Sequence, residues 1–315
     1  MAQITQFFGQ NMSMSSASLS SLSDQAPQAP TVVINTRPTE RATPLTEYLQ
    51  AAGLTVVEMP MLTLRLRESS ATDIDIMRRW FAGDYQALVI VSPTAAASGL
   101  AVWQALVKEH QQTDDRLPAA PSHIIAVGEA TASVLRDTQL QPNYEVLKPM
   151  IANNEGMLAM PEIEHLQAGD KLLVWRGLGG RRLLANTLKA RGVHIDSIAW
   201  YERVLPTDAM HNYQQWHQNF MTKERSQQPK PVVIVSSGTA FEHWIGVVKE
   251  TQTMQSDLGL KQVEALSLSD FNYVVLGERL ATMIAERQLD YWRVEDLAPA
   301  TILDAIQNDA LSSYS

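Results

Sequence analysis

The chain of 315 residues contains no cysteine. Disulfide bonds, zinc sites with thiolate ligands and thiol nucleophiles are therefore excluded. A chain without thiols suits a reducing compartment, so we expect a cytoplasmic protein. Positive charge is also scarce, because 25 Lys and Arg residues stand against 34 Asp and Glu residues and give a formal net charge of −9. Since nucleic-acid affinity depends on neutralising phosphates, we expect no nucleic-acid partner.

Long hydrophobic runs are missing too. No apolar run approaches the roughly 18 residues that a membrane-spanning helix needs, so we expect no membrane partner. The segment 1–30 has no basic start and no continuous apolar stretch, and we do not expect it to be a secretory signal. Its richness in Ser, Gln and Met predicts a disordered N-terminal tail.

The familiar catalytic and metal-binding motifs are absent as well. None of the seven histidines belongs to an H-E-x-x-H motif or to another ligand pair at helical spacing. His211 and His217 lie in the polar stretch 207–230, which we interpret as an insertion like 251–270, and we expect both at the surface. There is no G-x-S-x-G motif and no Asp-rich metal loop. We therefore expect neither metal nor cofactor, and either catalysis by positioning or binding alone.

What the sequence does contain is a pattern that occurs twice. The segment VVINTRPTERATPLTEYLQAAGLTVVEMP matches LLVWRGLGGRRLLANTLKARGVHIDSIAW, LVIVSPTA matches VVIVSSGTA, and IIAVGEATA matches YVVLGERLA. The matched positions include Arg37 and Arg176, Ser92 and Ser236, and Gly128 and Gly277. Three matches in the same order at a nearly constant offset indicate an internal duplication.

Each half alternates strand and helix patterns. The apolar runs at 89–91 and 233–235 are continuous, which is typical of strands buried on both faces of a parallel sheet that helices cover. In 44–52 the apolar residues recur at helical spacing, and Gly53 follows where a helix ends with positive φ. We therefore predict an α/β fold with two doubly wound parallel-sheet domains of similar topology and about five strands each.

Two segments interrupt this alternation. PMLTLRLRE, 60–68, alternates apolar and polar residues as a half-exposed strand does, and AWYERVLP, 199–206, is its counterpart in the other half. The two segments fit a two-stranded antiparallel β-ladder between the domains, with the chain crossing after residue 60 and returning near residue 201. A simple tandem arrangement of the two domains fits the pattern nearly as well.

The turns that follow the predicted strands are rich in Arg, Ser, Thr and Gly. Ligands of open α/β sheets bind beyond the carboxyl ends of the strands, where free N–H groups, hydroxyls and helix dipoles favour carboxylates or phosphates. Helix capping explains single Ser and Thr residues equally well, but it does not explain the clustering in both halves. Two such rows would line a cleft for a large polyanion. The candidate binding residues are Arg37, Ser92, Thr94, Gly128, Thr131, Arg176, Gly177, Arg181, Ser236, Ser237 and Arg279.

The turn RGLGGRR, 176–182, is the most unusual of these. Gly177 and Gly179 match the first two glycines of the dinucleotide fingerprint G-x-G-x-x-G, but Arg182 occupies the third position. A Walker A motif is also absent. The turn is thus suited to anions without being a recognised nucleotide site, and an oxidoreductase with a nucleotide cofactor is disfavoured.

Tyr201 is the strongest candidate for a catalytic side chain. We expect it to end a strand at the crossing, between Trp200 and Glu202. A phenol at that place can donate a proton while its ring packs against a flat ligand. Packing within the ladder is the alternative interpretation.

Together these motifs resemble the uroporphyrinogen-III synthase family. The resemblance extends from about Thr31 to Ile306. The motifs that carry it are TRP (36–38), VSPTA (91–95), VGEATA (127–132), LLVWRG…GGRRLLANTLKARGV (172–193), YERV (201–204), IVSSGTA (234–240) and LGERLA (276–281). The family has two α/β domains joined by a two-stranded ladder, and this favours the crossed arrangement. The implied bounds are 31–61 with 204–315 for domain 1, 66–199 for domain 2, and 62–65 and 200–203 for the linker strands.

The resemblance implies a reaction as well. The substrate would be hydroxymethylbilane, a linear tetrapyrrole that carries many carboxylates. The enzyme would expel its terminal hydroxyl as water, invert the last pyrrole ring through a spiro intermediate and close the ring to uroporphyrinogen III, as a monomer and without metal or cofactor. The family tyrosine that assists loss of the hydroxyl falls on Tyr201, the threonine of the G-x-x-T-A turn on Thr131, and a serine on Ser236 or Ser237.

One turn departs from the family pattern. Many members carry a threonine in the last glycine turn, whereas this chain has Gly277-Glu278-Arg279. Arg279 is therefore expected to replace the hydroxyl as an anion contact. The alternative to the enzyme is a non-catalytic two-domain protein that binds a small polyanion in the cleft between its domains.

Overall fold

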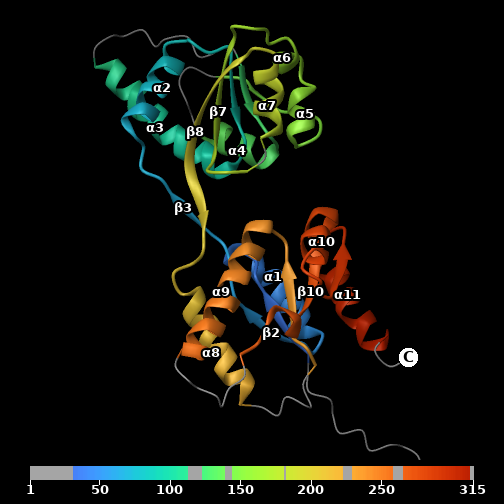
Figure 1. Cartoon of the computed structure of the whole chain (residues 1–315). Helices are drawn as coiled ribbons and strands as arrows, with labels where there is room; N and C mark the ends of the chain where they lie inside the picture. Colours follow the sequence, from blue (N-terminus) through green and yellow to red (C-terminus); the bar gives the residue numbers. More distant parts are fainter. Residues whose placement is uncertain are drawn as a thin grey trace, which may run out of the picture.

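The computed structural model describes residues 31–112, 123–138, 144–180, 182–222, 229–257 and 265–312. The expected disordered tail, 1–30, and the candidate residue Arg181 lie outside these ranges. The described chain forms two sheets with helices on their faces, one above the other in Figure 1.

The first sheet has, within the described residues, five parallel strands in the order β11-β10-β9-β1-β2. Their bounds are β1 Val32–Asn35, β2 Thr55–Glu58, β9 Val232–Val235, β10 Asn272–Leu276 and β11 Tyr291–Val294. The helices around it are α1 Thr39–Ala51, α8 Ala209–Met221, α9 Gly238–Asp257, α10 Gly277–Ala285 and α11 Pro299–Ser312, with a 3₁₀ turn at Leu268–Asp270. The sheet is thus built from segments at both ends of the described chain.

The second sheet has six described strands in the order β3-β8-β7-β4-β5-β6. Their bounds are β3 Thr63–Leu66, β4 Ala87–Ile90, β5 His123–Ala126, β6 Val146–Leu147, β7 Lys171–Gly177 and β8 His194–Val204. The helices around it are α2 Ala71–Phe81, α3 Pro93–Gln111, α4 Glu129–Asp137, α5 Asn154–Leu158, α6 Pro161–Glu164 and α7 Leu183–Ala190. All neighbouring strands pair in parallel except β3 and β8.

The two sheets share one strand order. The order β2-β1-β9-β10-β11 in the first sheet corresponds to β8-β7-β4-β5-β6 in the second. The segments that match in the sequence hold corresponding places, because β1 and β7 both lie beside the strand that follows them along the chain. The predicted α/β fold class is confirmed, and the sheet order excludes the tandem arrangement.

One long strand links the two sheets. β8 runs parallel to β7, and its last residues pair antiparallel with β3, so that Leu66 lies opposite Tyr201 and Thr63 opposite Val204 (Figure 1). The strand continues past Tyr201 because residues 201–204 pair with β3 in the two-stranded ladder. The expectation that a strand ends at Tyr201 is therefore wrong.

The stretch 207–230 is not simply an insertion, because it contains helix α8. His217 on this helix is 0 % exposed, and its Nε2 atom accepts a hydrogen bond of 3.3 Å from the Leu266 backbone N–H. The expected surface position of His217 is therefore wrong. The ring lies near that of Tyr213, one turn earlier, so the polar pattern concealed a buried face of the helix. The segment from residue 251 to residue 257 likewise continues helix α9.

The core of the second sheet contains a chain of contacting indole rings. Trp80 lies with its ring centroid 4.6 Å from Trp103 and 5.5 Å from Trp175, and Trp175 lies 5.9 Å from Trp200. All four side chains are buried, and the rings meet edge to face. This cluster fills the face of the sheet that α2 and α3 cover, behind the carboxyl ends of β7 and β8.

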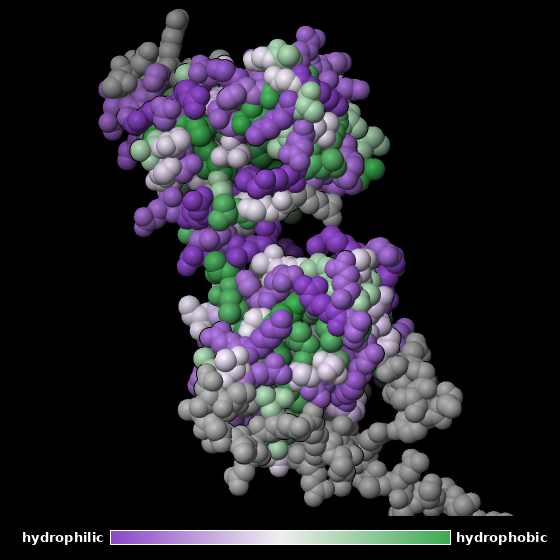
Figure 2. Space-filling model, viewed as in Figure 1, coloured by the Kyte–Doolittle hydropathy of each residue, from purple (hydrophilic) through white to green (hydrophobic). Residues whose placement is uncertain are grey.

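The strands of the two sheets point toward each other in Figure 1. The loops at their carboxyl ends therefore border the same space. Figure 2 shows a notch between the two halves, with hydrophilic residues on both sides of it. Among the described helices, none combines the length and the apolar character needed to cross a bilayer.

Candidate active site

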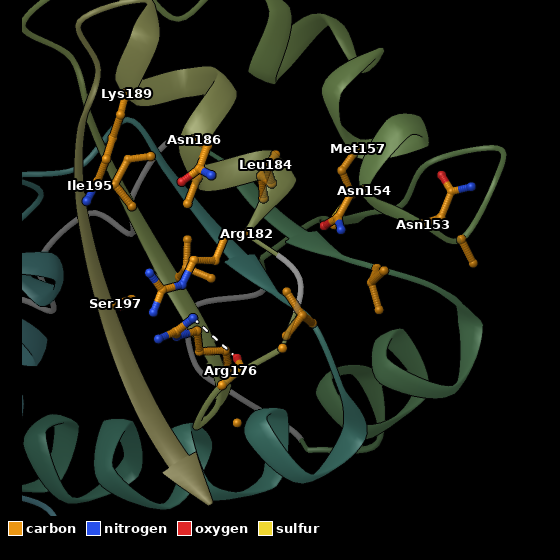
Figure 3. A pocket seen from close by; sticks show the side chains of 18 of the residues that line it. Asn153, Asn154, Met157, Arg176, Arg182, Leu184, Asn186, Lys189, Ile195 and Ser197 are labelled. Carbon is orange, nitrogen blue, oxygen red and sulfur yellow. Dashed lines mark hydrogen bonds between the residues drawn. The ribbon is translucent and has the colours of Figure 1, made fainter. Parts of the chain in front are cut away.

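A cavity of about 540 Å³ lies between the second sheet and the helices α5 and α7 (Figure 3). It extends from the carboxyl end of β7 along β8 to α7. Its apolar wall includes Met157, Val174, Leu184 and Ile195. A cavity of this size falls within the range of about 300–1,000 Å³ that is typical of small-molecule sites.

Strand alternation decides which side chains reach the cavity. Along β7, Val174 and Arg176 point to the face covered by α5 and α7, while Trp175 between them points into the indole cluster. Along β8, Ile195 and Ser197 share the cavity face by the same alternation. The apolar run of the sequence therefore places one arginine at the end of a buried strand with its side chain in the cavity.

The polar lining of the cavity is strongly cationic. Arg176, Arg182, Lys189 and Arg203 line it, together with neutral amides and Ser197, and no Asp or Glu is among the lining residues described. Figure 3 shows the cationic groups of Arg176, Arg182 and Lys189 directed toward β8. The cavity therefore concentrates positive charge in a protein whose formal net charge is −9.

None of these four cations forms an ion pair with any part of the chain that the structure describes. Many cations elsewhere are paired. Arg65 lies 2.8 Å from Glu202, Arg78 lies 3.3 Å from Glu109, and Glu129 contacts both Arg136 and Lys148. The four unpaired cationic side chains therefore make the cavity suited to an anionic ligand.

The glycine-rich turn holds Arg176 in place only weakly. Gly179 and Gly180 have φ angles of 76° and 87°, which favour glycine, and the carbonyl of Gly179 accepts a hydrogen bond of 3.4 Å from Arg176 Nη1. The Nε atom of Arg176 is buried without a hydrogen-bond partner. A buried N–H group without a partner costs about 1–3 kcal/mol, so a carboxylate ligand would satisfy a group that the free protein leaves unsatisfied.

Tyr201 also lines this cavity and is only 3 % exposed. Its phenol donates a hydrogen bond of 3.1 Å to the hydroxyl of Ser92. Gly177 permits the ring to lie there, because a Cβ atom at that position would be 2.6 Å from Tyr201 Cζ. The guanidinium carbon of Arg203 lies 5.6 Å from the centre of the ring on one side, in a cation–π arrangement.

Ser92 is the N-cap of helix α3, and its hydroxyl oxygen also accepts a hydrogen bond of 3.1 Å from the Ala95 backbone N–H. The oxygen thus accepts two hydrogen bonds, one from a backbone amide and one from Tyr201. A serine hydroxyl has two acceptor lone pairs and one donor. The proton of Ser92 therefore remains free to donate to a ligand.

The chain matches a known protein family over most of its length. A family model described as uroporphyrinogen-III synthase HemD matches residues 43–296, which is most of the chain. The chain belongs to the uroporphyrinogen-III synthase family. The family assignment agrees with the resemblance that the strand-end motifs carry.

Relatives and solved structures of this family are similar to the chain. It is 28% identical over 227 residues to uroporphyrinogen-III synthase of Salmonella typhimurium, covering 68% of this chain and 83% of that relative. It is 29% identical over 150 residues to uroporphyrinogen-III synthase of Escherichia coli, covering 43% and 55%. A mutant uroporphyrinogen III synthase of Thermus thermophilus has a similar fold, with a TM-score of 0.53, 13% identity, and coverage of 90% of this chain and 99% of that structure.

The structure brings some of the predicted site residues of this uroporphyrinogen-III synthase family member together. Arg176, Gly177 and Tyr201 line the cavity, and Ser92 contacts Tyr201. Thr94 lies half-buried in the first turn of α3. These residues come from three different segments of the chain and meet at the carboxyl ends of β4, β7 and β8.

Other predicted residues near the second sheet do not line the cavity. Gly128 is the N-cap of α4, and a Cβ atom there would lie 3.0 Å from Ala152 Cβ. Thr131, on the same helix, is only 2 % exposed. The structure therefore places the hydroxyl of Thr131 at a buried position of α4 rather than in the open cavity.

The predicted residues of the first sheet form a separate group. Arg37 follows β1, Ser236 and Ser237 follow β9, and Arg279 lies in the first turn of α10. Burial and the nearby charge of Arg41 lower the pKa of the Arg37 guanidinium below its ordinary value. The group lies at the carboxyl ends of the first sheet, which point toward the second sheet (Figure 1).

The guanidinium of Arg279 lies over the first turn of α9, where a Cβ atom on Gly238 would be 3.0 Å from Nη1. This arginine makes no ion pair with a described residue, and its Nη1 atom donates a hydrogen bond of 3.7 Å to the sulfur of Met283. In contrast, its neighbour Glu278 pairs with Arg293. Arg279 therefore places an unpaired cation beside the N-terminus of α9.

Sequence reasoning did not identify Lys189, Asn186, Ser197 or Arg203 as candidate residues, although all four line the cavity. Their only signal was periodicity, since Asn186 and Lys189 are three positions apart on one helix and Ser197 and Arg203 lie along one strand. The spacing of motifs does not reveal that α7 and β8 border the same cavity. Among the described residues, no cluster of His, Asp and Glu is suited to hold a metal ion.

Proposed function

We propose that the protein closes hydroxymethylbilane to uroporphyrinogen III, with inversion of the terminal pyrrole ring and loss of water, at the facing carboxyl ends of its two sheets. The observation that supports this proposal is the cavity lined by unpaired cations and by Tyr201, whose phenol is hydrogen-bonded to Ser92. The cations suit a polycarboxylate, and the hydroxyl pair suits a proton transfer.

In this proposal Tyr201 and Ser92 act together on the leaving hydroxyl. The proton of Ser92 is free to move onto the terminal hydroxyl of the substrate, and Tyr201 replaces it through the 3.1 Å hydrogen bond. The carbon–oxygen bond then breaks with its electron pair on the departing water. The cationic carbon that remains bonds to the substituted α-position of the last pyrrole ring and gives the spiro intermediate. The bond from that position to the neighbouring bridge carbon then breaks, and the bridge carbon bonds to the unsubstituted α-position of the same ring. The proton lost from that position returns to Tyr201 as the macrocycle closes.

Positioning supplies the rest of the proposed catalysis. A flexible linear polyacid has to be held with its two ends together, and orientation of this kind contributes as much as about 7–11 kcal/mol to the lowering of a barrier. At the second sheet, Arg176 and the other cavity cations would hold carboxylates of the substrate. At the first sheet, other carboxylates would be held by Arg37, Ser236, Ser237 and Arg279. The backbone N–H groups around Gly128 would add neutral donors.

The remaining predictions are part of the same proposal. We propose that the protein is a cytoplasmic monomer whose partner is the tetrapyrrole and not a nucleic acid, as its lack of cysteine and its acidic composition suggest. The domain bounds derived from the sequence also remain predictions.

A coupled assay tests the proposed function. Purified protein is mixed with hydroxymethylbilane, and the isomers formed are separated after oxidation. The type III isomer is the expected product, whereas unassisted closure gives the type I isomer. Tight binding of the substrate with no excess of type III over a protein-free control would contradict the proposal and favour the non-catalytic polyanion-binding protein instead.

A further inference from the structure

A β-bulge interrupts the pairing of β7 and β8 just before Tyr201. Arg176 of β7 pairs with Ala199 of β8, but the next residue of β7, Gly177, pairs with Tyr201, so Trp200 is an extra residue on β8. Bulges are rare between parallel strands, and they bend the strand that contains the extra residue and redirect its side chains. The direction of the Tyr201 side chain is therefore set by a local irregularity of the backbone.

The bulge lies at the point where Tyr201 crosses the sheet to reach Ser92. In the second sheet, β7 lies between β8, which carries Tyr201, and β4, which Ser92 follows. A side chain of β8 reaches the end of β4 only by crossing the carboxyl end of β7. The Tyr201 ring crosses at Gly177, where a Cβ atom would lie 2.6 Å from Tyr201 Cζ, and its phenol donates the 3.1 Å hydrogen bond to Ser92. The contact between the two hydroxyls thus depends on the bent end of β8.

Arg67, the residue that follows β3, binds both carbonyl groups of the bulge. Its backbone N–H donates a hydrogen bond of 2.9 Å to the Trp200 carbonyl, and its Nη1 atom donates one of 2.8 Å to the Ala199 carbonyl. These carbonyls belong to the two peptide groups that flank the extra residue. From the other side, the Leu178 backbone N–H donates a hydrogen bond of 2.7 Å to the Tyr201 carbonyl. Three hydrogen bonds, two of them from Arg67, therefore hold the backbone of the bulge.

We propose that Arg67 is a positioning residue, which acts through the backbone of β8 to hold Tyr201 against Ser92. The side chain of Arg67 is exposed, lies outside the lining of the cavity and forms no ion pair within the part of the chain that the structure describes. The inference rests on the proposed function and goes beyond it, because it assigns a role in the reaction to a residue of the ladder outside the cavity.

Arg65, two positions earlier on β3, provides a matched control. Its guanidinium pairs with the carboxylate of Glu202 across the same ladder at 2.8 Å. That contact joins two side chains, whereas the guanidinium of Arg67 binds a backbone carbonyl of the bulge. Removal of the Arg65 side chain therefore leaves both carbonyls of the bulge with their donors.

The kinetic test compares Arg67→Met, which keeps an unbranched stem without its donors, with Arg67→Lys, which restores a cationic donor, and with Arg65→Met. We expect R67M to lower kcat for the type III isomer at least tenfold and to change KM less than twofold, because a misplacement of about 1 Å costs as much as about 10²-fold in rate. R67K is expected to recover most of the rate, and R65M is expected to keep it. Added to Tyr201→Phe, R67M is expected to cause no further loss, since Arg67 acts through Tyr201.

A fluorine label reports the position of the ring without the reaction. Fluorotyrosine replaces Tyr201 in the full chain, and the fluorine NMR signal is recorded for the wild type, R67M and R65M. We expect R67M to shift the signal, because the ring loses its fixed place beside Ser92. We expect R65M to leave the signal where the wild type has it.

Two kinetic results would overturn the inference. One is wild-type kcat in R67M that is folded by circular dichroism, and the other is a further tenfold loss when R67M is added to Tyr201→Phe. Arg67→Gln, whose shorter side chain cannot span the same distance, replaces R67M if that variant does not fold. A protein that forms no type III isomer contradicts the proposed function instead. The fluorine signal then decides alone, and a signal that R67M leaves unmoved overturns the positioning role.

Discussion

Tyr201 donates a hydrogen bond of 3.1 Å to Ser92, which lies 109 positions earlier in the chain. The tyrosine lies on β8, where that strand leaves the second sheet to pair with β3, and the serine caps helix α3. The bond therefore connects the ladder between the two halves with the helix that follows β4. It also leaves the serine proton available as a donor, because the phenol proton is already engaged in the bond to Ser92.

Removing either hydroxyl is expected to slow the reaction by a similar factor. Tyr201→Phe removes the proton donor to Ser92, and Ser92→Ala removes the group that meets the ligand. Loss of general acid assistance typically costs about 10²–10⁴-fold in rate. Because the two groups act as one unit, the double variant is expected to be no slower than the slower single variant. Steady-state formation of the type III isomer measures all three.

The controls for this pair separate catalysis from helix capping. Ser92→Ala also removes an N-cap, which costs about 1 kcal/mol of stability. Ser70→Ala removes the N-cap of α2, whose hydroxyl accepts a hydrogen bond from Asp73 N–H away from the cavity, and it is expected to keep full activity. Ser92→Thr keeps the hydroxyl and is expected to recover most of the rate. Full activity of Tyr201→Phe would refute the role of the pair.

Gly177→Ala tests whether the position of the tyrosine ring matters. The added methyl group would lie 2.6 Å from Tyr201 Cζ and 3.0 Å from its hydroxyl oxygen, so the ring has to move. Movement breaks the bond to Ser92, and we expect a loss of at least tenfold in turnover in a protein that still unfolds cooperatively. The readouts are the isomer assay and thermal unfolding. Wild-type turnover in this variant would show that the observed ring position is not needed.

The sequence carried enough information for the fold because the fold depends on local patterns. Continuous apolar strands and the duplicated strand-end motifs predicted two parallel sheets, and Gly53 adopts the positive φ of 87° that its place after a helix required. The site was predicted only in part. Arg176 and Tyr201 were found because they follow or interrupt a recognisable strand. Lys189 was missed because only the packing of α7 against β8 brings it to the cavity.

His217 is a residue for which the sequence pattern gave a wrong prediction. Its neighbours in the sequence are polar, and that composition favoured a surface insertion. The ring is buried beside Tyr213 of the same helix, and it accepts a hydrogen bond from the Leu266 backbone N–H. A weakly amphipathic helix with polar residues on most positions hides a buried face from composition alone.

Gly99→Ala tests the indole cluster behind the site. A Cβ atom at position 99 would lie 2.3 Å from a ring carbon of Trp175, and that ring is buried against Trp80 and Trp200 with no space to move. Overpacking of this kind costs about 1–3 kcal/mol of unfolding free energy. Denaturant titration followed by tryptophan fluorescence measures it.

A matched substitution makes this prediction sharper. Gly246 lies inside helix α9, and a Cβ atom there meets nothing within 4 Å. Gly246→Ala is therefore expected to raise the unfolding free energy by up to about 1 kcal/mol, through helix propensity alone. Equal effects of the two substitutions would show that the contact between Gly99 and Trp175 is not tight.

Tyr85 is expected to make stability depend on alkaline pH. Burial, followed by its 2.5 Å hydrogen bond to Asp196, raises the pKa of this phenol well above its usual range. A pKa raised in the folded state contributes stability that is fully present below the unfolded pKa of about 10 and is lost as the pH rises above it. Tyr85→Phe is expected to flatten this decline and to cost about 1–2 kcal/mol at pH 7, because a hydrogen bond to a carboxylate is lost.

Denaturant unfolding between pH 7 and pH 11 checks the prediction for Tyr85. Tyr48→Phe is the control, because that side chain is 44 % exposed and its phenol is in contact with solvent. Its decline above pH 10 is expected to match that of the wild type. Burial also raises the pKa values of Tyr213 and Tyr273, so Tyr85→Phe is expected to remove only part of the decline. A decline as steep as that of the wild type would show that the Tyr85 phenol contributes none of it.

Arg176→Ala separates a binding arginine from a structural one. The Nε atom of Arg176 is buried without a partner and its Nη1 atom makes only one long hydrogen bond, so the side chain contributes little to the folded state. We expect the unfolding free energy to stay the same or to rise, because the substitution removes a buried N–H group that has no hydrogen-bond partner among the described residues. Substrate affinity should fall at least tenfold, and its dependence on salt should weaken, because one screened attraction to a carboxylate is gone.

Arg78→Ala removes a surface arginine paired with Glu109 outside the cavity and should leave both affinity and salt dependence unchanged. Unaltered affinity in a folded Arg176→Ala protein would remove this arginine from the site.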